Sequence, residues 1–290
     1  TPGTRARIPR HHAIALAIAS LPVLAVAQPL GGQVVSGNAS IVQTGAPGQT
    51  LTTVKQNSAT TSINWQSFNL GVGDTVKFIQ PSKDAVAVNR ISDTAGSKIL
   101  GSIQANGQVW LLNPNGILFG KDAQINVGGL LASTLSTLDP VASGSINNAV
   151  QGLRGSSKAP VVNLGQIKTT EGGYVALLGH SVSNQGSIKA DQGSIALGAG
   201  SDLSLQFEGS RLLSVKVNQH QLDALAGNGG LLQADGGRVI LTAGARDSVL
   251  ASAVNNTGVV QARSYSENAK GYLNLGTVGP RHVRGQGGEF

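Results

Sequence analysis

Short alternations of apolar and polar residues run along most of the chain. Examples within residues 28–60 are "QVVSG", "ASIVQ" and "LTTVKQ". Gly, Asn and Ser separate these runs, which is the pattern of short strands joined by tight turns. We therefore expect an all-β protein. One helical turn is plausible, in "NQHQLDALAG" at residues 218–227, as an excursion from the strands.

The second half of the sequence contains an internal repeat. "NQGSIKADQGSIALGA" (184–199) aligns without gaps with "NGGLLQADGGRVILTA" (228–243), and further copies begin at residues 163 and 256. The four starts are 21, 44 and 28 residues apart. This spacing predicts a unit of about 21 to 22 residues, with the longest interval spanning two units and the last carrying an insertion.

A unit this small cannot bury its own apolar face, so neighbouring units must stack. The alignment pairs Ile188 with Leu232 and Ile195 with Val239, and these side chains would stack in the interior. The prediction is a parallel β-helix, with Gly and Asn at corners where a positive φ is tolerated. A leucine-rich repeat has a similar period but needs a helical half, which the pattern lacks.

Residues 61–138 contain the most strongly apolar runs and most of the large aromatic side chains. Such side chains are most often core or interface anchors, and we predict that these lie in the core. They are Trp65, Phe68, Phe78, Trp110 and Phe119.

The best-defined turn of the sequence lies in "VWLLNPNGILFG" (109–120), between two apolar runs. Pro114 presets φ for the second position of a turn, and Asn113 can cap it. Asn115 and Gly116 tolerate the backbone conformation that closes the turn.

Composition narrows the class of protein. The chain has 290 residues with 40 Gly, and its charged fraction of 12% is low beside a typical value of about 25%. Hydrophobic residues make up 40% of it, which argues against disorder. Cysteine is absent, so neither a disulfide framework nor a thiolate metal site can form.

The first 27 residues have the three parts of an export signal: a basic start, an apolar stretch and an A-x-A cleavage site. The apolar stretch is too short for a transmembrane helix, and we expect no stable membrane insertion. The sequence lacks an initial Met and ends in "GQGGEF", so we interpret it as a fragment open at both ends. The basic residues are Arg5, Arg7 and Arg10. Ala25 and Ala27 form the A-x-A site, and cleavage is predicted between Ala27 and Gln28.

Without this leader, 18 basic residues face 14 acidic ones, a net charge of +4. That value is small for a chain of this length, and no run of five Lys or Arg occurs. We therefore expect no nucleic-acid partner.

Catalytic patterns are missing from the sequence. "GILFGKD" (116–122) is one residue short of a phosphate loop and has Asp122 where Ser or Thr must bind magnesium. His180 follows a predicted strand and should be a solvated edge residue. Asp191 and Asp235 occupy equivalent repeat positions, but the acidic residues are otherwise spread almost singly. We predict no catalytic residue, no cofactor and no metal site.

An ordered set of segments over about residues 30–140 then indicates a family. It comprises "INWQSFNLGVGDTVKFIQP" (63–81), "AVAVNRI" (85–91) and "ILGSIQANGQVWLLNPNGILFGKDAQINVGGLLASTL" (99–135). The chain resembles the N-terminal domain of filamentous haemagglutinin-type exoproteins, the secreted partners of two-partner (type Vb) secretion. The resemblance implies a right-handed parallel β-helix with extra-helical β-hairpins and an N-terminal cap.

The resemblance also implies an export route and a partner. The chain would cross the inner membrane, meet the POTRA domains of a dedicated outer-membrane β-barrel transporter in the periplasm, and reach the surface of a Gram-negative cell. Some members carry a second motif, Asn-Pro-Asn-Leu, but Asn-Pro occurs only once here. The motif required for secretion corresponds to Asn113, Pro114, Asn115, Gly116 and Ile117.

Two roles for this motif stay open. The turn can nucleate the first coils, which the apolar flanks Val109, Leu111, Ile117 and Phe119 favour, or it can dock the transporter directly. In the first case, an exposed strand beside it would pair with the transporter by β-augmentation.

The expected organisation is a signal peptide (1–27), the core of the secretion domain (28–140), a loop or excursion (141–160) and continuing β-helix repeats (161–290). The expected function is the secretion domain of a large adhesin or haemagglutinin, whose downstream regions could bind host-cell or carbohydrate receptors. A haem-acquisition exoprotein, a cytolysin and a contact-dependent toxin carrier share the same route. A carbohydrate-active β-helix enzyme is the alternative from another class.

Overall fold

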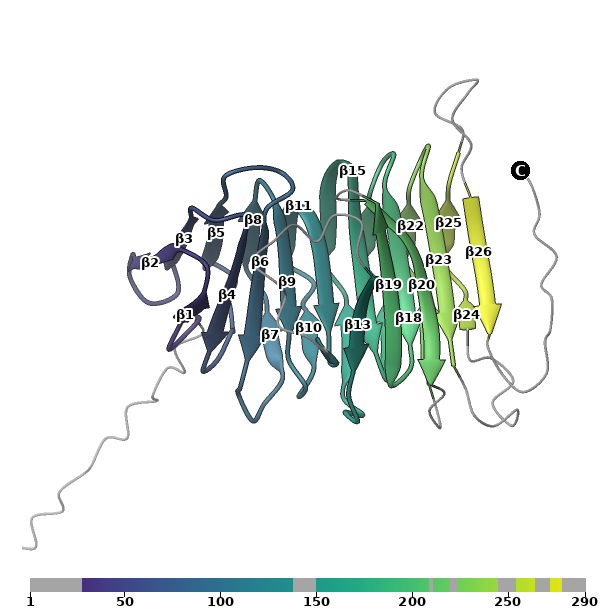
Figure 1. Cartoon of the computed structure of the whole chain (residues 1–290), viewed down its shortest axis with the longest axis horizontal. Helices are drawn as coiled ribbons and strands as arrows, with labels where there is room; N and C mark the ends of the chain where they lie inside the picture. Colours follow the sequence, from purple (N-terminus) through teal and green to yellow (C-terminus); the bar gives the residue numbers. More distant parts are fainter. Residues whose placement is uncertain are drawn as a thin grey trace, which may run out of the picture.

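The computed structural model describes residues 28–137, 150–208, 211–219, 224–244, 254–263 and 272–277. All regular structure in these ranges is β-strand, and the chain winds as a mostly parallel β-helix from one end of the molecule to the other (Figure 1). The β-helix predicted from the sequence is confirmed. No helix among these residues is long and apolar enough to cross a membrane.

Strands of successive coils stack into three faces. The first face contains β4 (Thr60–Trp65), β6 (Val86–Ile91), β9 (Gln108–Leu112), the second halves of β11 (Gln124–Ser133) and β15 (Gln166–Gly179), β18 (Ser194–Ala199), β23 (Arg238–Ala243) and β26 (Tyr272–Thr277). The second face contains β3 (Leu51–Gln56), β5 (Thr75–Ile79), β8 (Ser102–Ala105), the first halves of β11 and β15, β17 (Ser187–Lys189), β22 (Leu231–Gln233) and β25 (Val259–Gln261). The third face contains β7 (Ser97–Ile99), β10 (Ile117–Phe119), β14 (Pro160–Asn163), β16 (Ser181–Asn184), β21 (Leu225–Asn228) and β24 (Val254–Asn256).

The N-terminal end of the β-helix is closed by two antiparallel strands. β1 (Gln33–Ser36) pairs with β4, and β2 (Ala39–Thr44) pairs with β3. Because both run against the direction of the coils, the parallel stack ends here. These strands form the N-terminal cap that the resemblance implies.

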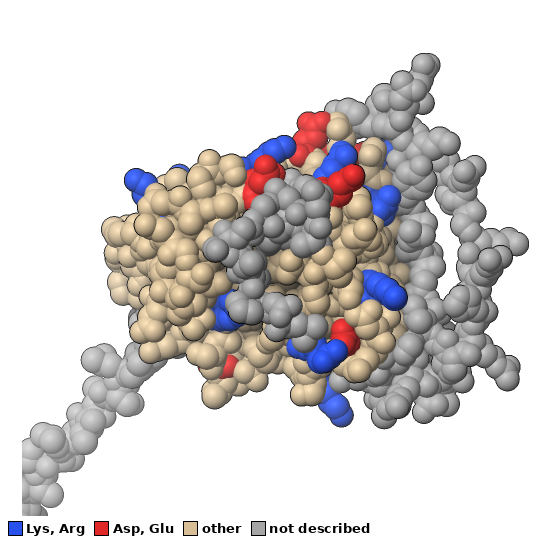
Figure 2. Space-filling model, in the orientation of Figure 1, with Lys and Arg blue, Asp and Glu red and all other residues tan. Residues whose placement is uncertain are grey.

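A separate antiparallel sheet lies on the outside of the first face (Figure 1). Its order is β12-β13-β19-β20, made of β12 (Ser136–Thr137), β13 (Val150–Arg154), β19 (Asp202–Glu208) and β20 (Arg211–Gln219). We call it the extra-helical sheet. The charged side chains on this side of the molecule are sparse and lie mostly near its upper and lower margins (Figure 2).

Two local predictions can be compared with the structure. In the segment 141–160, expected to be a loop or an excursion, β13 leaves the coils and is a strand of the extra-helical sheet, and residues 141–149 lie outside the described part of the chain. The helical turn predicted over 218–227 is wrong where the structure describes it. Asn218 and Gln219 end β20, and Leu225 begins β21.

The register of the coils tests the repeat directly. Asn163 pairs with Asn184, one 21-residue unit later, and the predicted pairs of Ile188 with Leu232 and Ile195 with Val239 are confirmed. Asn184, however, pairs directly with Asn228. The 44-residue interval is therefore one coil carrying the inserted hairpin β19–β20, and the prediction of two units is wrong.

Alternation along the strands produces two hydrophobic cores. On β9, Val109 and Leu111 point into the coils, whereas Trp110 and Leu112 point outward and are covered by the extra-helical sheet. Of the five aromatics predicted for the core, Trp65, Phe68, Phe78 and Phe119 lie in the inner core and Trp110 in the outer one, each at most 1% exposed.

Polar atoms in the outer core are paired within it. The Trp110 indole Nε1 donates to the Tyr174 hydroxyl at 2.7 Å, and that hydroxyl donates to Gln108 Oε1 at 2.8 Å. Phe207 of the extra-helical sheet packs edge-on against Tyr174, with ring centroids 5.3 Å apart. Burial raises the pKa of Tyr174 far above its usual value. The first face and the extra-helical sheet thus share one packed layer.

Two columns of small polar or achiral residues hold successive coils at close spacing. An asparagine ladder on the third face has amide-to-amide hydrogen bonds of 2.7 Å at each of its three steps. At the corner between the second and first faces, glycines stack so closely that a Cβ atom on one would collide with the carbonyl oxygen of the one before. The ladder consists of Asn163, Asn184, Asn228 and Asn256, and the corner glycines are Gly128, Gly173, Gly193 and Gly237.

Candidate recognition site at the NPNG turn

The turn of residues 113–116 joins β9 of the first face to β10 of the third face. The Gly116 N–H donates to the Asn113 carbonyl oxygen at 3.1 Å, which closes a four-residue β-turn. The Asn113 side-chain oxygen accepts the Asn115 N–H at 2.9 Å. Gly116 has a φ of 107°, a conformation that favours glycine at this position.

Asn113 ties three coils together from a fully buried position. Its side-chain Nδ2 donates to Ser97 Oγ at 3.0 Å in the preceding coil. Its backbone N–H donates to the Ser133 carbonyl at 3.0 Å in the following coil. The first residue of the motif is therefore part of the framework of the β-helix.

The two central residues, Pro114 and Asn115, form an exposed tip. The Asn115 amide donates to the Asp93 carbonyl at 2.6 Å, so its side chain is held in one direction. The Ser157 hydroxyl donates to the Pro114 carbonyl. Ser157 belongs to residues 155–159, an extended segment without regular structure that runs past the tip and that we call the strap.

A groove of about 600 Å³ lies between the tip and the strap. Small and hydroxyl-bearing side chains line most of it, among them Thr94 and Ser136, and Lys158 is the cation among its lining residues. Such a surface offers hydrogen-bonding groups and one positive charge, and it has no carboxylate. It suits a polar or acidic partner surface.

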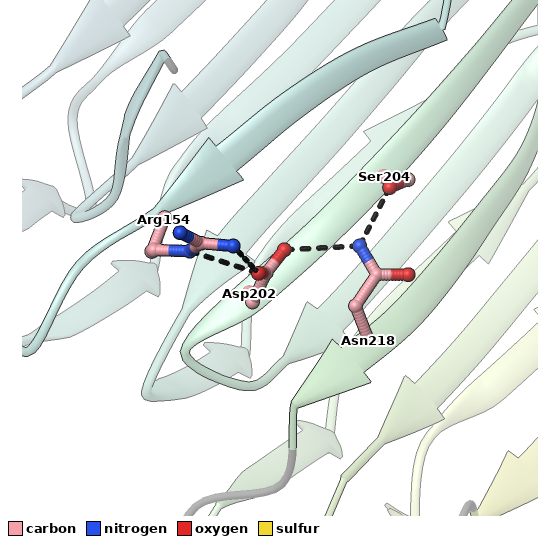
Figure 3. Close-up of polar contacts among 4 residues, drawn as sticks. All are labelled: Arg154, Asp202, Ser204 and Asn218. Carbon is pink, nitrogen blue, oxygen red and sulfur yellow. Dashed lines mark hydrogen bonds and ion pairs between the residues drawn. The ribbon is translucent and has the colours of Figure 1, made fainter.

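An ion-pair network fixes the start of the strap (Figure 3). Arg154 Nε and Nη2 lie 2.9 and 2.6 Å from Asp202 Oδ2. Asn218 donates from Nδ2 to Asp202 Oδ1 at 2.9 Å and to Ser204 Oγ at 2.6 Å. The network joins β13, β19 and β20, so the extra-helical sheet sets where the strap leaves it.

This network predicts an acid-sensitive extra-helical sheet. The hydrogen bond from Asn218, together with Arg154, holds the pKa of Asp202 below its usual value. A carboxyl whose pKa is lower in the folded state contributes stability above its unfolded pKa, and loses it as pH falls through the folded pKa. We expect the difference in unfolding free energy between wild type and Asp202→Asn to be full at pH 6 and to shrink below about pH 4.

Urea unfolding followed by circular dichroism between pH 2 and 6 measures this difference. Asp122→Asn is the matched control, because it removes an exposed carboxylate with no hydrogen bond or ion pair among the described residues. That control should keep the acid sensitivity of the wild type. A difference for Asp202→Asn that is constant over the whole range would contradict the assignment.

The strands beside the turn have no free edge. β9 is paired with both β6 and β11, and β10 with both β7 and β14. The expectation that a strand adjoining the motif pairs with a partner is therefore wrong for these two strands. β12 also borders the groove, but it has two residues, and the Thr137 hydroxyl accepts a hydrogen bond of 2.9 Å from Arg90.

Other candidate residues do not gather into a site. His180 is 7% exposed, so the prediction of a solvated edge residue is wrong; it is enclosed at the corner between β15 and β16. Within the described ranges, no group of three or more His, Cys, Asp or Glu could hold a metal ion. Of the predicted cleavage residues, Ala25 and Ala27 lie outside these ranges, and Gln28 is the first residue inside them.

Comparisons with known proteins show which family and which proteins this chain resembles. The profile of the TPS secretion domain family matches residues 25–279. A heme/hemopexin-binding protein of Haemophilus influenzae strain Rd is 34% identical over 228 residues, covering 77% of this chain and 24% of that protein. A second protein of that name from Haemophilus influenzae is 32% identical over 248 residues, covering 78% and 26%. The chain thus spans about a quarter of the length of the curated relatives that it matches.

A solved structure is also similar. It is the crystal structure of the HMW1 secretion domain from Haemophilus influenzae, with a TM-score of 0.71 and 28% sequence identity. The match covers 87% of this chain and 66% of that one.

Proposed function

The chain belongs to the TPS secretion domain family, and on this premise we propose that its partner reads the tip of the NPNG turn. A domain of this family is the secretion domain of an exported exoprotein and has a cognate outer-membrane transporter. In our proposal the POTRA domains of that transporter contact Pro114 and Asn115 and enter the groove beside them. The observation that carries the proposal is the division within the motif, which has a buried first residue and an exposed tip.

Neighbouring residues of the motif therefore have different roles in this proposal. Asn113 and Gly116 shape the turn and connect coils, and Ile117 continues into the inner core. Asn115 is exposed and its amide is held by Asp93, so it is preorganised for a partner, which lowers the entropy cost of binding. Lys158 adds a positive charge at the groove that steers an acidic surface toward it.

The proposed route follows from the leader. Residues 1–27 direct the chain across the inner membrane of a Gram-negative cell and are removed before Gln28. The domain then meets the POTRA domains in the periplasm and leaves through the transporter to the cell surface.

Site-specific photocrosslinking tests the contact. A photoreactive residue at position 115 should crosslink to the POTRA domains of the cognate transporter in the periplasm. The matched control is position 72, because Val72 is 64% exposed and lies in a different coil corner. Equal crosslinking at both positions, or crosslinking only at position 72, would contradict the proposed contact.

A second proposal concerns the whole exoprotein. The leading expectation is an adhesin or haemagglutinin, but both curated relatives are named heme/hemopexin-binding proteins, which favours a haem-acquisition exoprotein. Binding of the full-length protein to haemin-agarose tests this, with residues 28–290 as the control. Retention of the full-length protein alone supports haem acquisition by downstream regions, and retention of neither contradicts it.

A further inference from the structure

The second face carries a single file of side-chain N–H donors on its outer surface. Strand register places one donor in each of five consecutive coils, because each of these residues pairs directly with the next. Neighbouring strands lie about 4.7 to 4.9 Å apart, so the file runs for roughly 19 Å along the axis of the β-helix. The donor file consists of Lys77, Gln104, Asn126, Lys168 and Lys189.

All five side chains are exposed, and none of them makes a hydrogen bond or ion pair within the described part of the chain. The strand residues that pair on the second face and in its cap strand, β2, include no Asp or Glu. Glu171 of β15 follows the part of that strand, Gln166–Thr169, that lies on this face. Lys55 adds a further exposed positive charge on β3. Among its described strand residues, this face is therefore positive and rich in donors, with no carboxylate between them.

The three faces differ in what they can offer to a partner. The first face is covered by the extra-helical sheet (Figure 1). The third face exposes one lysine, Lys98, followed in the same column by Leu118 and Val162. Among the described residues, the second face differs from the other two in having exposed donors in every coil of a five-coil run.

The linear arrangement selects the kind of ligand. A membrane surface is a plane and would be matched by cations spread across a face, whereas here the donors follow one line. Single-stranded nucleic acid requires aromatic platforms for its bases, and the outward positions of these strands hold no aromatic residue. A linear chain with regularly spaced anionic groups fits both observations.

We propose that the donor file is a binding site for an acidic polysaccharide that lies along the axis of the β-helix. Lysine ammonium groups at its two ends would pair with carboxylate or sulfate groups. Gln104 and Asn126 between them would donate to anionic or hydroxyl oxygens. This site is on a different face from the NPNG turn, so it is independent of the proposed contact with the transporter.

Alginate oligosaccharides, which carry a carboxylate on every sugar, are the probe. Their binding to the purified full chain is measured by calorimetry at low and physiological salt, with neutral dextran as the negative control. We expect alginate to bind, dextran not to bind, and the affinity to fall as salt rises. Lys168→Gln/Lys189→Gln should weaken binding about tenfold, because two exposed ion pairs are lost.

Two further variants separate the site from net charge. Lys98→Gln/Lys216→Gln removes the same charge from exposed positions off the file and should leave binding within about twofold of wild type. Gln104→Glu/Asn126→Asp places carboxylates in the middle of the file and should abolish binding, while the circular dichroism spectrum stays unchanged. Equal loss in both lysine pairs would overturn the proposal, as would binding to anionic phospholipid vesicles in the absence of alginate binding.

Discussion

Replacing Gly193 by alanine should prevent the chain from completing its β-helix. A Cβ atom at this position would lie 1.8 Å from the carbonyl oxygen of Gly173 in the preceding coil. Contacts this short do not occur in proteins, so the coils would have to move apart. The neighbouring steps of the corner are nearly as close. A Cβ atom added at Gly173 or at Gly237 would lie 2.1 Å from the carbonyl oxygen of the preceding glycine, so no adjacent coil can absorb the movement.

The expected cost exceeds about 4 kcal/mol, because the collision is with backbone and breaks parallel strand pairing on two faces. Urea unfolding followed by circular dichroism measures it. Gly227→Ala is the matched control, since its Cβ atom would lie 3.8 Å from the nearest atom, the Val182 carbonyl oxygen. That variant should stay within about 1 kcal/mol of wild type, and equal losses in both variants would refute the stacking argument.

The second large effect is expected from the asparagine ladder. Asn184 is fully buried, accepts from Asn163 and donates to Asn228, each at 2.7 Å. Asn184→Ala removes both hydrogen bonds. The side-chain N–H donor of Asn163 and the side-chain oxygen of Asn228 then lose their partner in the ladder. Buried polar groups left in this way cost about 1 to 3 kcal/mol each, so we expect a loss of about 3 kcal/mol or more.

Thermal unfolding of the purified domain measures this loss, with Asn255→Ala as the control. Asn255 is exposed and precedes the last residue of the ladder on β24. The control should leave the melting temperature unchanged to within about 1 °C, while Asn184→Ala should lower it by several degrees. A melting temperature unchanged in Asn184→Ala would show that the ladder does not stabilise the coils.

The sequence predicts the coils well because their cause is local. Alternation defines strands, and recurrence at 21 residues places Asn163 under Asn184. The prediction that the 44-residue interval spans two units is wrong because a long hairpin folded outward has the same alternating pattern as a coil. The outward direction of Trp110 could not be predicted for the same reason, because a large apolar side chain is stable there only where a second sheet covers it.

Part of the candidate site can also be predicted from the sequence, because its cause is local. Asn113 to Gly116 are turn formers in sequence, and the structure has the turn they predict. The strap has no such signal, because the pair that anchors it, Arg154 and Asp202, is 48 residues apart. The donor file cannot be predicted from the sequence without the strand register, because its five residues are unequally spaced along the chain.

The architecture is compatible with passage through a narrow channel. Each coil contacts its neighbours mainly, so the fold can grow as the chain emerges. The absence of cysteine means that no disulfide can lock the chain beforehand. The cap strands β1 and β2 precede the coils in the sequence.

Secretion of residues 1–290 from a Gram-negative host, with and without the cognate transporter, tests whether the transporter recognises this chain at the NPNG turn. We expect release of the wild type only with the transporter. We expect Asn115→Ala to stay in the periplasm, although the purified variant keeps the wild-type circular dichroism and melting temperature. Asn113→Ala should also be retained, but with a lowered melting temperature. Release without the transporter would contradict the assignment as a secretion domain, and normal release of Asn115→Ala would contradict recognition at the tip of the turn.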